Sequence, residues 1–256
     1  MLKNRVLIMA LISLLIVVGV FLFVAPIPQD SNYHNFADGR TIFHLSNFWN
    51  VLSNVPFFIV GTLGLYKLYS NRLTILNSMQ FGYILLFVGV SLVAFGSGYY
   101  HLEPNNETLV WDRLPMTIAF MSLFAILLSE FVEESLGKRV LFPLLTVGIG
   151  SVFYWYWGEL HGYGDLRAYA LVQFLPMLII PILLFVFKSH YSYIKGYWLL
   201  LLCYLLAKVF EHFDAEIYAL LGQAISGHSL KHMVAGLGMY ILLVSYEKRV
   251  KNELST

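Results

Sequence analysis

The chain has 256 residues, of which 59% are hydrophobic, 16% aromatic and only 12% charged, and its formal net charge is +1. Soluble domains carry roughly 25% charged residues, so this composition excludes an ordinary soluble protein. No basic run suits nucleic acid, and the single cysteine, Cys203, excludes an intramolecular disulfide and a Cys-x-x-Cys metal site.

Hydrophobic blocks of about 16–22 residues recur along the chain, close to the ~20 residues needed to cross the hydrocarbon core of a bilayer. The connections between the blocks are short. We therefore expect one compact all-α integral membrane domain without a flexible linker. The eight predicted spans, in chain order, cover residues 6–25, 48–66, 77–98, 114–132, 140–157, 168–187, 196–213 and 229–246.

The first predicted span has two interpretations. Lys3 and Arg5, followed by an apolar stretch, also form the pattern of a secretory signal peptide. The apolar run of about 20 residues exceeds the usual 7–15 residues of a signal peptide, and no clean A-x-A site follows, which favours a retained helix. We expect residues 1–27 to be a signal anchor or an additional transmembrane helix, and residues 28–256 to be the main helical domain.

The basic residues predict an orientation in the membrane. Eleven of the sixteen Lys and Arg residues lie before the first span or after the second, fourth, sixth and eighth spans. The positive-inside rule makes that side cytoplasmic, so both termini are expected in the cytoplasm. Of the eight histidines, only His190 falls in a predicted cytoplasmic loop. Any chemistry performed by histidine is therefore expected at the extracytoplasmic face.

Chemically useful side chains meet at the hairpin between the third and fourth spans, in "GSGYYHLEPNNETLVWDRLP". Ser97 and His101 are four residues apart, so a helix stacks them on one face. Asp112 follows eleven residues after His101, where the fourth span is expected to begin. A hydroxyl, an imidazole and a carboxylate are thus predicted at one membrane level.

His228 and His232 lie one helical turn apart at the head of the last span, at the same predicted level as His101. Three neutral imidazoles suit Zn²⁺, whose catalytic sites commonly have three protein ligands and a water. Asp112 would then orient that water or move its proton, and Ser97 would hydrogen-bond the water or a developing oxyanion. The alternative is that the histidines are ordinary interfacial residues, and spacing alone leaves both interpretations open.

A second polar set lies in "AKVFEHFDAEIY", where Lys208, Glu211 and Asp214 recur every three residues along one side of the seventh span. We favour a satisfied charge network that holds helices together. The other interpretation is a set of groups that orients a zinc-bound imidazole, as a ligating histidine usually requires. His161 and His212 are the alternative metal ligands.

The order and spacing of the Ser, His, Asp and His-x-x-x-His residues resemble the alkaline ceramidase family, which shares a superfamily with adiponectin-receptor-like membrane proteins. The stretch "FWNVLSNVPFFIVG", with Asn50 and Ser53, is similar to the first core helix of that family. The segments "YHNFADGR" and "GDLRAYALVQF" are similar to bacterial members. The resemblance covers about residues 30–246.

The resemblance implies a seven-transmembrane-helix core with a zinc ion near one membrane face, here preceded by one additional helix. By matching position, His101, His228 and His232 would be the zinc ligands, with Asp112 as acid–base partner and Ser97 beside it. Asn50 and Ser53, like Lys208, Glu211 and Asp214, would lie around the ligands or the cavity. The implied reaction is hydrolysis of the amide bond of ceramide or a similar N-acyl lipid in a bacterial inner membrane. It releases a fatty acid and a sphingoid-type amine.

The chain departs from the animal and yeast members, which carry an acidic calcium-binding cluster before the first core helix. Here that region offers Asp30 and Asp38, and Asn47 stands where the pattern has Glu. Because Ca²⁺ prefers several carboxylate oxygens, calcium control is not expected. The expected partners are the bilayer and its lipids, without nucleic acid or an obligate protein partner.

Three other functions compete with the lipid amidase. The first is a zinc-containing seven-helix receptor or sensor, which Ser97 and Asp112 disfavour because a structural zinc normally takes four protein ligands. The second is a hydrolase of another membrane lipid ester or amide. The third is a metal-free transporter or proton relay, which predicts inverted repeats and helices broken within the membrane. The sequence pattern indicates neither feature.

Overall fold

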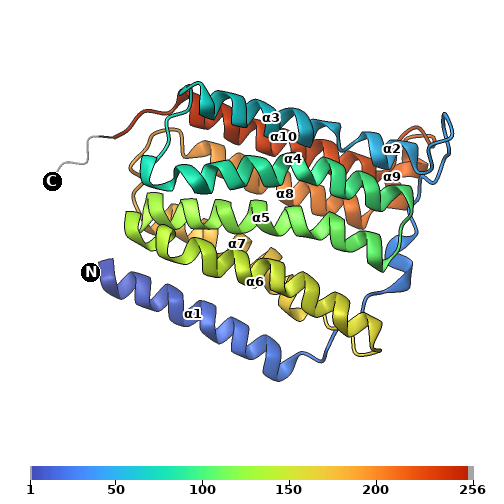
Figure 1. Cartoon of the computed structure of the whole chain (residues 1–256), viewed down its shortest axis with the longest axis horizontal. Coiled ribbons are helices and arrows are strands. Elements are labelled where there is room, and N and C mark those ends of the chain that lie inside the picture. The colour runs from blue at the N-terminus through green and yellow to red at the C-terminus, as the bar shows by residue number, and fades with distance from the viewer. Residues whose placement is uncertain (1, 253–256) are drawn as a thin grey trace.

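The structure is a computed structural model that describes residues 2–252, and it is built from helices (Figure 1). Within that range the β-structure is limited to isolated bridges, and turns and loops connect the helices. Two short 3-10 turns, η1 (Ser31–His34) and η2 (Asn77–Met79), precede α2 and α4. The α-helices are α1 (Leu2–Phe23), α2 (Phe48–Leu52), α3 (Val55–Tyr69), α4 (Gln80–Leu102), α5 (Asn106–Phe131), α6 (Glu134–Leu160), α7 (Arg167–Val186), α8 (Lys195–His212), α9 (Asp214–Leu220) and α10 (Gly227–Lys248).

Every predicted span falls on a helix or on the α2–α3 pair. Among the described residues, seven helices are long and apolar enough to cross a membrane, or eight if the bent α8–α9 pair is counted as one span. The predicted all-α, multi-pass membrane fold with an apolar N-terminal helix is thus confirmed. The start of the fourth span was wrong, because α5 begins at Asn106. The Asn105 side chain accepts a hydrogen bond from Thr108 N in a capping box, which fixes that start.

The core helices lie roughly along one direction in a single bundle (Figure 1). Along the bundle, α3 packs on α4, α4 on α5, and α5 on both α6 and α7, while α10 packs between α3 and α8. Direct contacts between α7 and α8 are few. The bundle is therefore less tightly packed between these two helices than elsewhere. Helix α1 lies outside the bundle and contacts α7.

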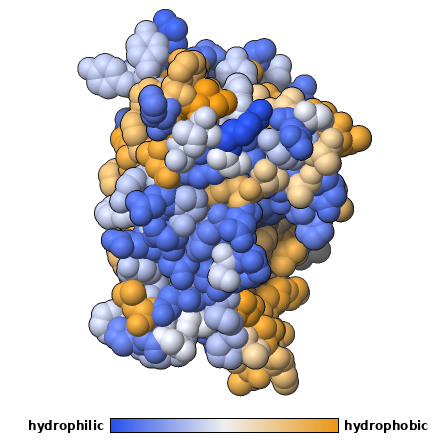
Figure 2. Space-filling model, turned by 90° about the vertical axis from the view of Figure 1, so that its right-hand side faces the viewer, coloured by the Kyte–Doolittle hydropathy of each residue, from blue (hydrophilic) through white to orange (hydrophobic). Residues whose placement is uncertain are grey.

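The surface of the bundle has an apolar side face and a hydrophilic end, as expected of a protein in a bilayer. Large apolar side chains such as Leu15, Phe95 and Phe185 are exposed along its length, where lipid chains would cover them. Figure 2 looks onto the end that carries α2 and α9, and its central surface is mostly hydrophilic. We call this end the loop end, and the opposite end, which holds both chain termini, the terminal end.

A buried ion pair fastens the terminal end. Arg249, directly after α10, donates through Nη2 to Glu130 Oε1 at 2.6 Å and through Nη1 to Glu130 Oε2 at 2.9 Å. The side chains are 1% and 0% exposed, and the Tyr83 and Tyr197 hydroxyls complete the network. Arg249 counts among the loop cations in the topology prediction, but it is a buried residue that joins α10 to α5.

Two spans are broken at the loop end, which the sequence analysis did not anticipate. Helix α2 stops at Leu52 before α3 begins at Val55, and α9 turns by 81° from α8. Asp214 is the first residue of α9. It therefore leaves the face of α8 that carries Lys208 and Glu211, and the prediction of one continuous polar stripe is wrong for Asp214.

The close approach of α4 to α5 depends on Gly96. A Cβ at this position would collide with the backbone oxygen of Trp111. We expect Gly96→Ala to lower the melting temperature of the detergent-solubilised protein, because such overpacking costs about 1–3 kcal/mol and outweighs the better helix propensity of Ala, worth about 1 kcal/mol.

Gly150→Ala is the matched control, since its added Cβ would meet no atom within 4 Å. Its melting temperature should equal or exceed that of the wild type. If Gly96→Ala and Gly150→Ala have the same melting temperature, this account of the α4–α5 contact is wrong.

Candidate metal centre

Three buried histidines meet at the loop end. His101 lies in the last turn of α4, and His228 and His232 lie in the first two turns of α10. Their exposed fractions are only 1%, 5% and 6%, and one ring nitrogen of each lies within 4.8 Å of the others. His101 Nε2 and His228 Nε2 are 3.3 Å apart. The structure therefore brings together the three histidines singled out by their spacing.

The hydrogen bonds of His232 define its tautomer. The Ser53 hydroxyl donates to the carbonyl oxygen of Asn50 at 3.1 Å. Its oxygen lies 2.8 Å from His232 Nδ1 and can accept the Nδ1 proton. His232 Nε2 is then left with a lone pair for the cluster. Thus Ser53, expected near the ligands, orients one of the imidazoles.

The donor set fits a divalent transition metal. Lone pairs on neutral ring nitrogens repel at close range unless a cation or a proton lies between them, and burial disfavours protonated imidazole. His101 Nδ1 is also buried without a hydrogen-bond partner within residues 2–252, so nothing on that side fixes the ring. Three imidazoles with no carboxylate in the cluster suit zinc and leave a fourth position open.

The backbone around the histidines is held by the remaining polar residues. Asn47 donates to the His101 carbonyl oxygen at 2.9 Å. Asn50 Oδ1 accepts from the Ser229 hydroxyl at 2.8 Å, which ties α2 to α10. Asp214 accepts from the backbone N–H of His228 at 2.6 Å. Asn50 and Asp214 therefore hold the start of helix α10 in place. These hydrogen bonds do not involve the imidazole rings.

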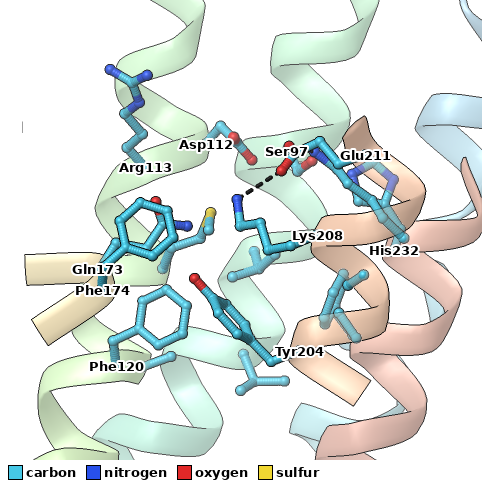
Figure 3. Close-up of a pocket in the computed structure, with 18 of the residues that line it drawn as sticks. Ser97, Asp112, Arg113, Phe120, Gln173, Phe174, Tyr204, Lys208, Glu211 and His232 are labelled. Atoms are coloured by element: carbon cyan, nitrogen blue, oxygen red, sulfur yellow. Dashed lines mark hydrogen bonds and ion pairs between the residues drawn. The ribbon is translucent and has the colours of Figure 1, made fainter. Parts of the chain in front are cut away.

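A cavity of about 350 Å³ runs from the cluster into the bundle (Figure 3). Its polar part includes Ser97, Asp112 and His232, and its deeper walls are mainly apolar, with Phe120, Leu200 and Met239 among them. The Ser97 side chain lies near the Asp112 carboxylate (Figure 3). One continuous space therefore offers polar groups at its histidine end and room for a hydrocarbon chain beyond them.

A family model described as Ceramidase matches residues 40–253, which is most of the chain and includes every residue of the cluster. The chain belongs to the ceramidase family. No curated protein matches it. Membership supports hydrolysis of a ceramide-type amide, and therefore a lipid substrate.

Further charged residues line the cavity of this ceramidase-family protein. Glu211 Oε2 accepts from Lys208 Nζ at 2.7 Å, and Glu211 Oε1 accepts from Lys231 Nζ at 2.5 Å. The favoured charge network therefore exists for Lys208 and Glu211, but its third member is Lys231. Sequence reasoning overlooked Lys231, although its place between two candidate ligands was a usable signal.

The segment before the family match covers the cluster from the loop end. Phe36 packs against the rings of His101 and His228, at centroid distances of 4.7 and 4.5 Å. His34 fastens the segment by contacts of 2.9 Å with the Tyr100 hydroxyl and with Asn106 Oδ1. Phe36 thus shields the imidazoles from solvent. It lies in the "YHNFADGR" segment that resembles bacterial members, but the sequence analysis gave it no role.

The two alternative ligands lie outside the cluster. His161 is exposed and its Nδ1 contacts the Trp157 carbonyl oxygen at 2.8 Å. His212 packs on Phe213 with ring centroids 4.7 Å apart. Neither belongs to the group of residues that could share a metal ion.

The loop before α7 anchors the N-terminal helix. Arg167 donates to Asp165 and to the backbone oxygens of Phe21 and Val24. Burial alone would raise the pKa of Asp165, but the hydrogen bonds from Arg167 lower it to about 2. Asp165 therefore stays ionised above that pH, and this loop acts as a structural clamp on α1.

The contact between Ser53 and His232 predicts a measurable effect on metal affinity. Ser53→Ala removes the acceptor of the Nδ1 proton, so the ring is no longer held in the ligating tautomer. Loss of such a partner typically weakens metal binding by about 10–100-fold. We expect this loss in a chelator competition assay on the purified protein.

Ser70→Ala provides the control, because the Ser70 hydroxyl contacts only carbonyl oxygens of its own helix at the terminal end. Its metal affinity should match that of the wild type. Equal affinities in all three proteins would show that Ser53 does not orient His232.

Proposed function

We propose that the protein is a zinc-dependent hydrolase that cleaves the amide bond of ceramide or a similar N-acyl lipid within the membrane. The observation that carries the proposal is the cluster of three buried imidazoles, one of which, His232, lines the polar part of a cavity that is otherwise mainly apolar. A lipid amide placed in this cavity would have its polar group at the cluster and its chain among the apolar walls.

The histidines, Asp112 and Ser97 have distinct proposed roles. His101, His228 and His232 hold the zinc ion. Zinc bound there supplies Lewis-acid activation of a water and of the amide carbonyl. Asp112 accepts the proton of the attacking water and passes it to the leaving amine, which general acid–base catalysis requires. Ser97 orients the Asp112 carboxylate through its hydroxyl. The net reaction consumes one water and releases a fatty acid and an amine.

The helix arrangement offers a path for the substrate. The cavity is lined by Phe174 of α7 and by Leu200 and Tyr204 of α8. These two helices make few direct contacts with each other. We propose that the lipid enters between α7 and α8 from the bilayer, so that it need not leave the hydrocarbon phase before it reaches the zinc.

The proposed enzyme is a multi-pass protein of a bacterial inner membrane. The loop end, with the zinc site, would face the extracytoplasmic side, and both termini would lie in the cytoplasm. Residues 1–27 would add a signal anchor or transmembrane helix to the catalytic domain of residues 28–256. Support comes from the basic residues near the terminal end and from a family match that begins after α1.

Metal content tests the zinc proposal directly. Purified wild-type protein is expected to hold about one zinc per chain by mass spectrometry. His232→Ala should lose it, because two imidazoles bind zinc far more weakly than three. His161→Ala, which changes an exposed histidine outside the cluster, should keep the metal. A folded wild type that can neither retain nor be reloaded with zinc would refute the proposal.

Asp112→Asn separates a catalytic zinc from a structural one. The variant should keep its zinc, because Asp112 is outside the histidine cluster. Its kcat for amide hydrolysis should fall by about 10²–10⁴-fold, the usual contribution of general acid–base catalysis. Glu107→Gln, in the exposed first turn of the same helix, should retain wild-type kcat. Undiminished turnover in Asp112→Asn would remove Asp112 from the mechanism.

A further inference from the structure

The polar part of the cavity holds more positive than negative side chains. Asp112 and Glu211 are its carboxylates, while Arg113, Lys208 and Lys231 are its cations. Glu211 forms ion pairs with both lysines, Lys208 and Lys231. Ionisable groups at membrane depth are costly unless they are paired and usually mark functional sites. The additional cation is Arg113, whose guanidinium lies over the Trp155 and Tyr169 rings. The cavity side chains therefore carry a net positive charge, and a bound metal cation would add to it.

Lys208 is the cation best placed to bind a ligand. Its Nζ donates to Glu211 Oε2, the one hydrogen-bond acceptor it has among the described residues, although an ammonium carries three donors. Its side chain is 33% exposed, compared with 17% for Lys231. Figure 3 shows the amine end of Lys208 pointing into the cavity, between Asp112 and Tyr204. Two of its N–H donors are thus available to a molecule in the cavity.

Two neutral polar groups lie in the same part of the cavity. Tyr204 precedes Lys208 by one helical turn on α8, and its hydroxyl is buried without a hydrogen-bond partner within residues 2–252. Gln173 of α7 also lines the cavity. An ammonium, a hydroxyl and an amide can all donate hydrogen bonds. These three groups could therefore donate to an oxygen-rich anion in the cavity that His232 also lines.

We propose that Lys208 selects substrates that carry a carboxylate on the amine side of the amide, which makes N-acyl amino acids the preferred class. This inference rests on the proposed hydrolase function. The carboxylate of an N-acyl amino acid is two bonds from the amide nitrogen, so it stays beside the metal centre when the carbonyl is at the zinc. It would neutralise the surplus charge and use the free donors of Lys208.

The reaction on such a substrate is balanced without another reactant. Water adds its oxygen to the acyl carbon, and the bond between that carbon and the amide nitrogen breaks. The products are a fatty acid and a free amino acid, whose nitrogen takes up the proton. No electron transfer occurs. Lys208 contacts the carboxylate that does not react, so it is a specificity-determining residue and takes no part in the chemical step.

Two matched lipids test the proposal. N-palmitoylserine and N-palmitoylserinol have the same acyl chain and amide, but the carboxylate of the first is a hydroxymethyl group in the second. We expect wild-type kcat/KM to favour N-palmitoylserine by at least about tenfold, since hydrogen bonds to charged groups are worth about 1.5–3 kcal/mol. Lys208→Met should abolish this preference, and Lys208→Arg should retain it.

The readout is a ratio of two substrates, so a general loss of folding or metal would lower both rates and leave the ratio unchanged. Glu211 keeps Lys231 as a partner in both Lys208 variants. Lys188→Met removes an exposed lysine at the other end of the molecule and should show the wild-type ratio. A wild type that prefers N-palmitoylserinol, or a ratio unchanged by Lys208→Met, overturns the proposal.

Binding separates this proposal from the hydrolase function. Thermal stabilisation of the wild type and Lys208→Met is measured with both amides and with palmitate. Stronger, Lys208-dependent binding of N-palmitoylserine without turnover would support the carboxylate subsite and reject the hydrolase. Lys208-dependent binding of palmitate but not of N-palmitoylserine would overturn the proposal, because Lys208 would then recognise the released fatty acid.

Discussion

The site depends on the convergence of three imidazole nitrogens in a dry environment. His101 Nε2 and His228 Nε2 are 3.3 Å apart, and His232 completes the cluster. At this distance the two nitrogens share a proton or face a common cation, and three neutral imidazoles suit a divalent metal. The helices must therefore hold the three rings close together in a buried place. The tight α4–α5 contact at Gly96 and the hydrogen bonds of Ser53 and Asn50 provide this constraint.

The breaks in two spans serve the same end. A side chain at each break contacts a histidine of α10. Ser53 reaches the ring of His232, and Asp214 accepts from the backbone of His228. Non-helical backbone within a membrane protein is tolerated where protein buries it. Here the breaks lie beside the histidines, so they stabilise the cluster.

The sequence predicted those features that follow from helical periodicity. Span hydrophobicity predicted the helices, and the spacing of Ser97 from His101 and of His228 from His232 predicted which side chains share a face. Periodicity failed where the chain changes direction, as it does at Asp214. It also could not identify partners brought together by tertiary packing. From the sequence, Arg249 was assigned to a cytoplasmic loop. Its partner Glu130 is 119 residues away in the sequence, and only the folded structure shows that the two side chains are in contact.

The charges around the cavity connect stability with specificity. At the terminal end, Arg249 meets Glu130 in a closed network that leaves no room for a ligand. At the loop end, two lysines share Glu211, and Lys208 still has donors directed into open space. A purely structural network would be expected to pair its charges as completely as the first one does, because unpaired charge in a low dielectric is costly. The incomplete pairing around Lys208 is therefore best explained by a ligand that completes it.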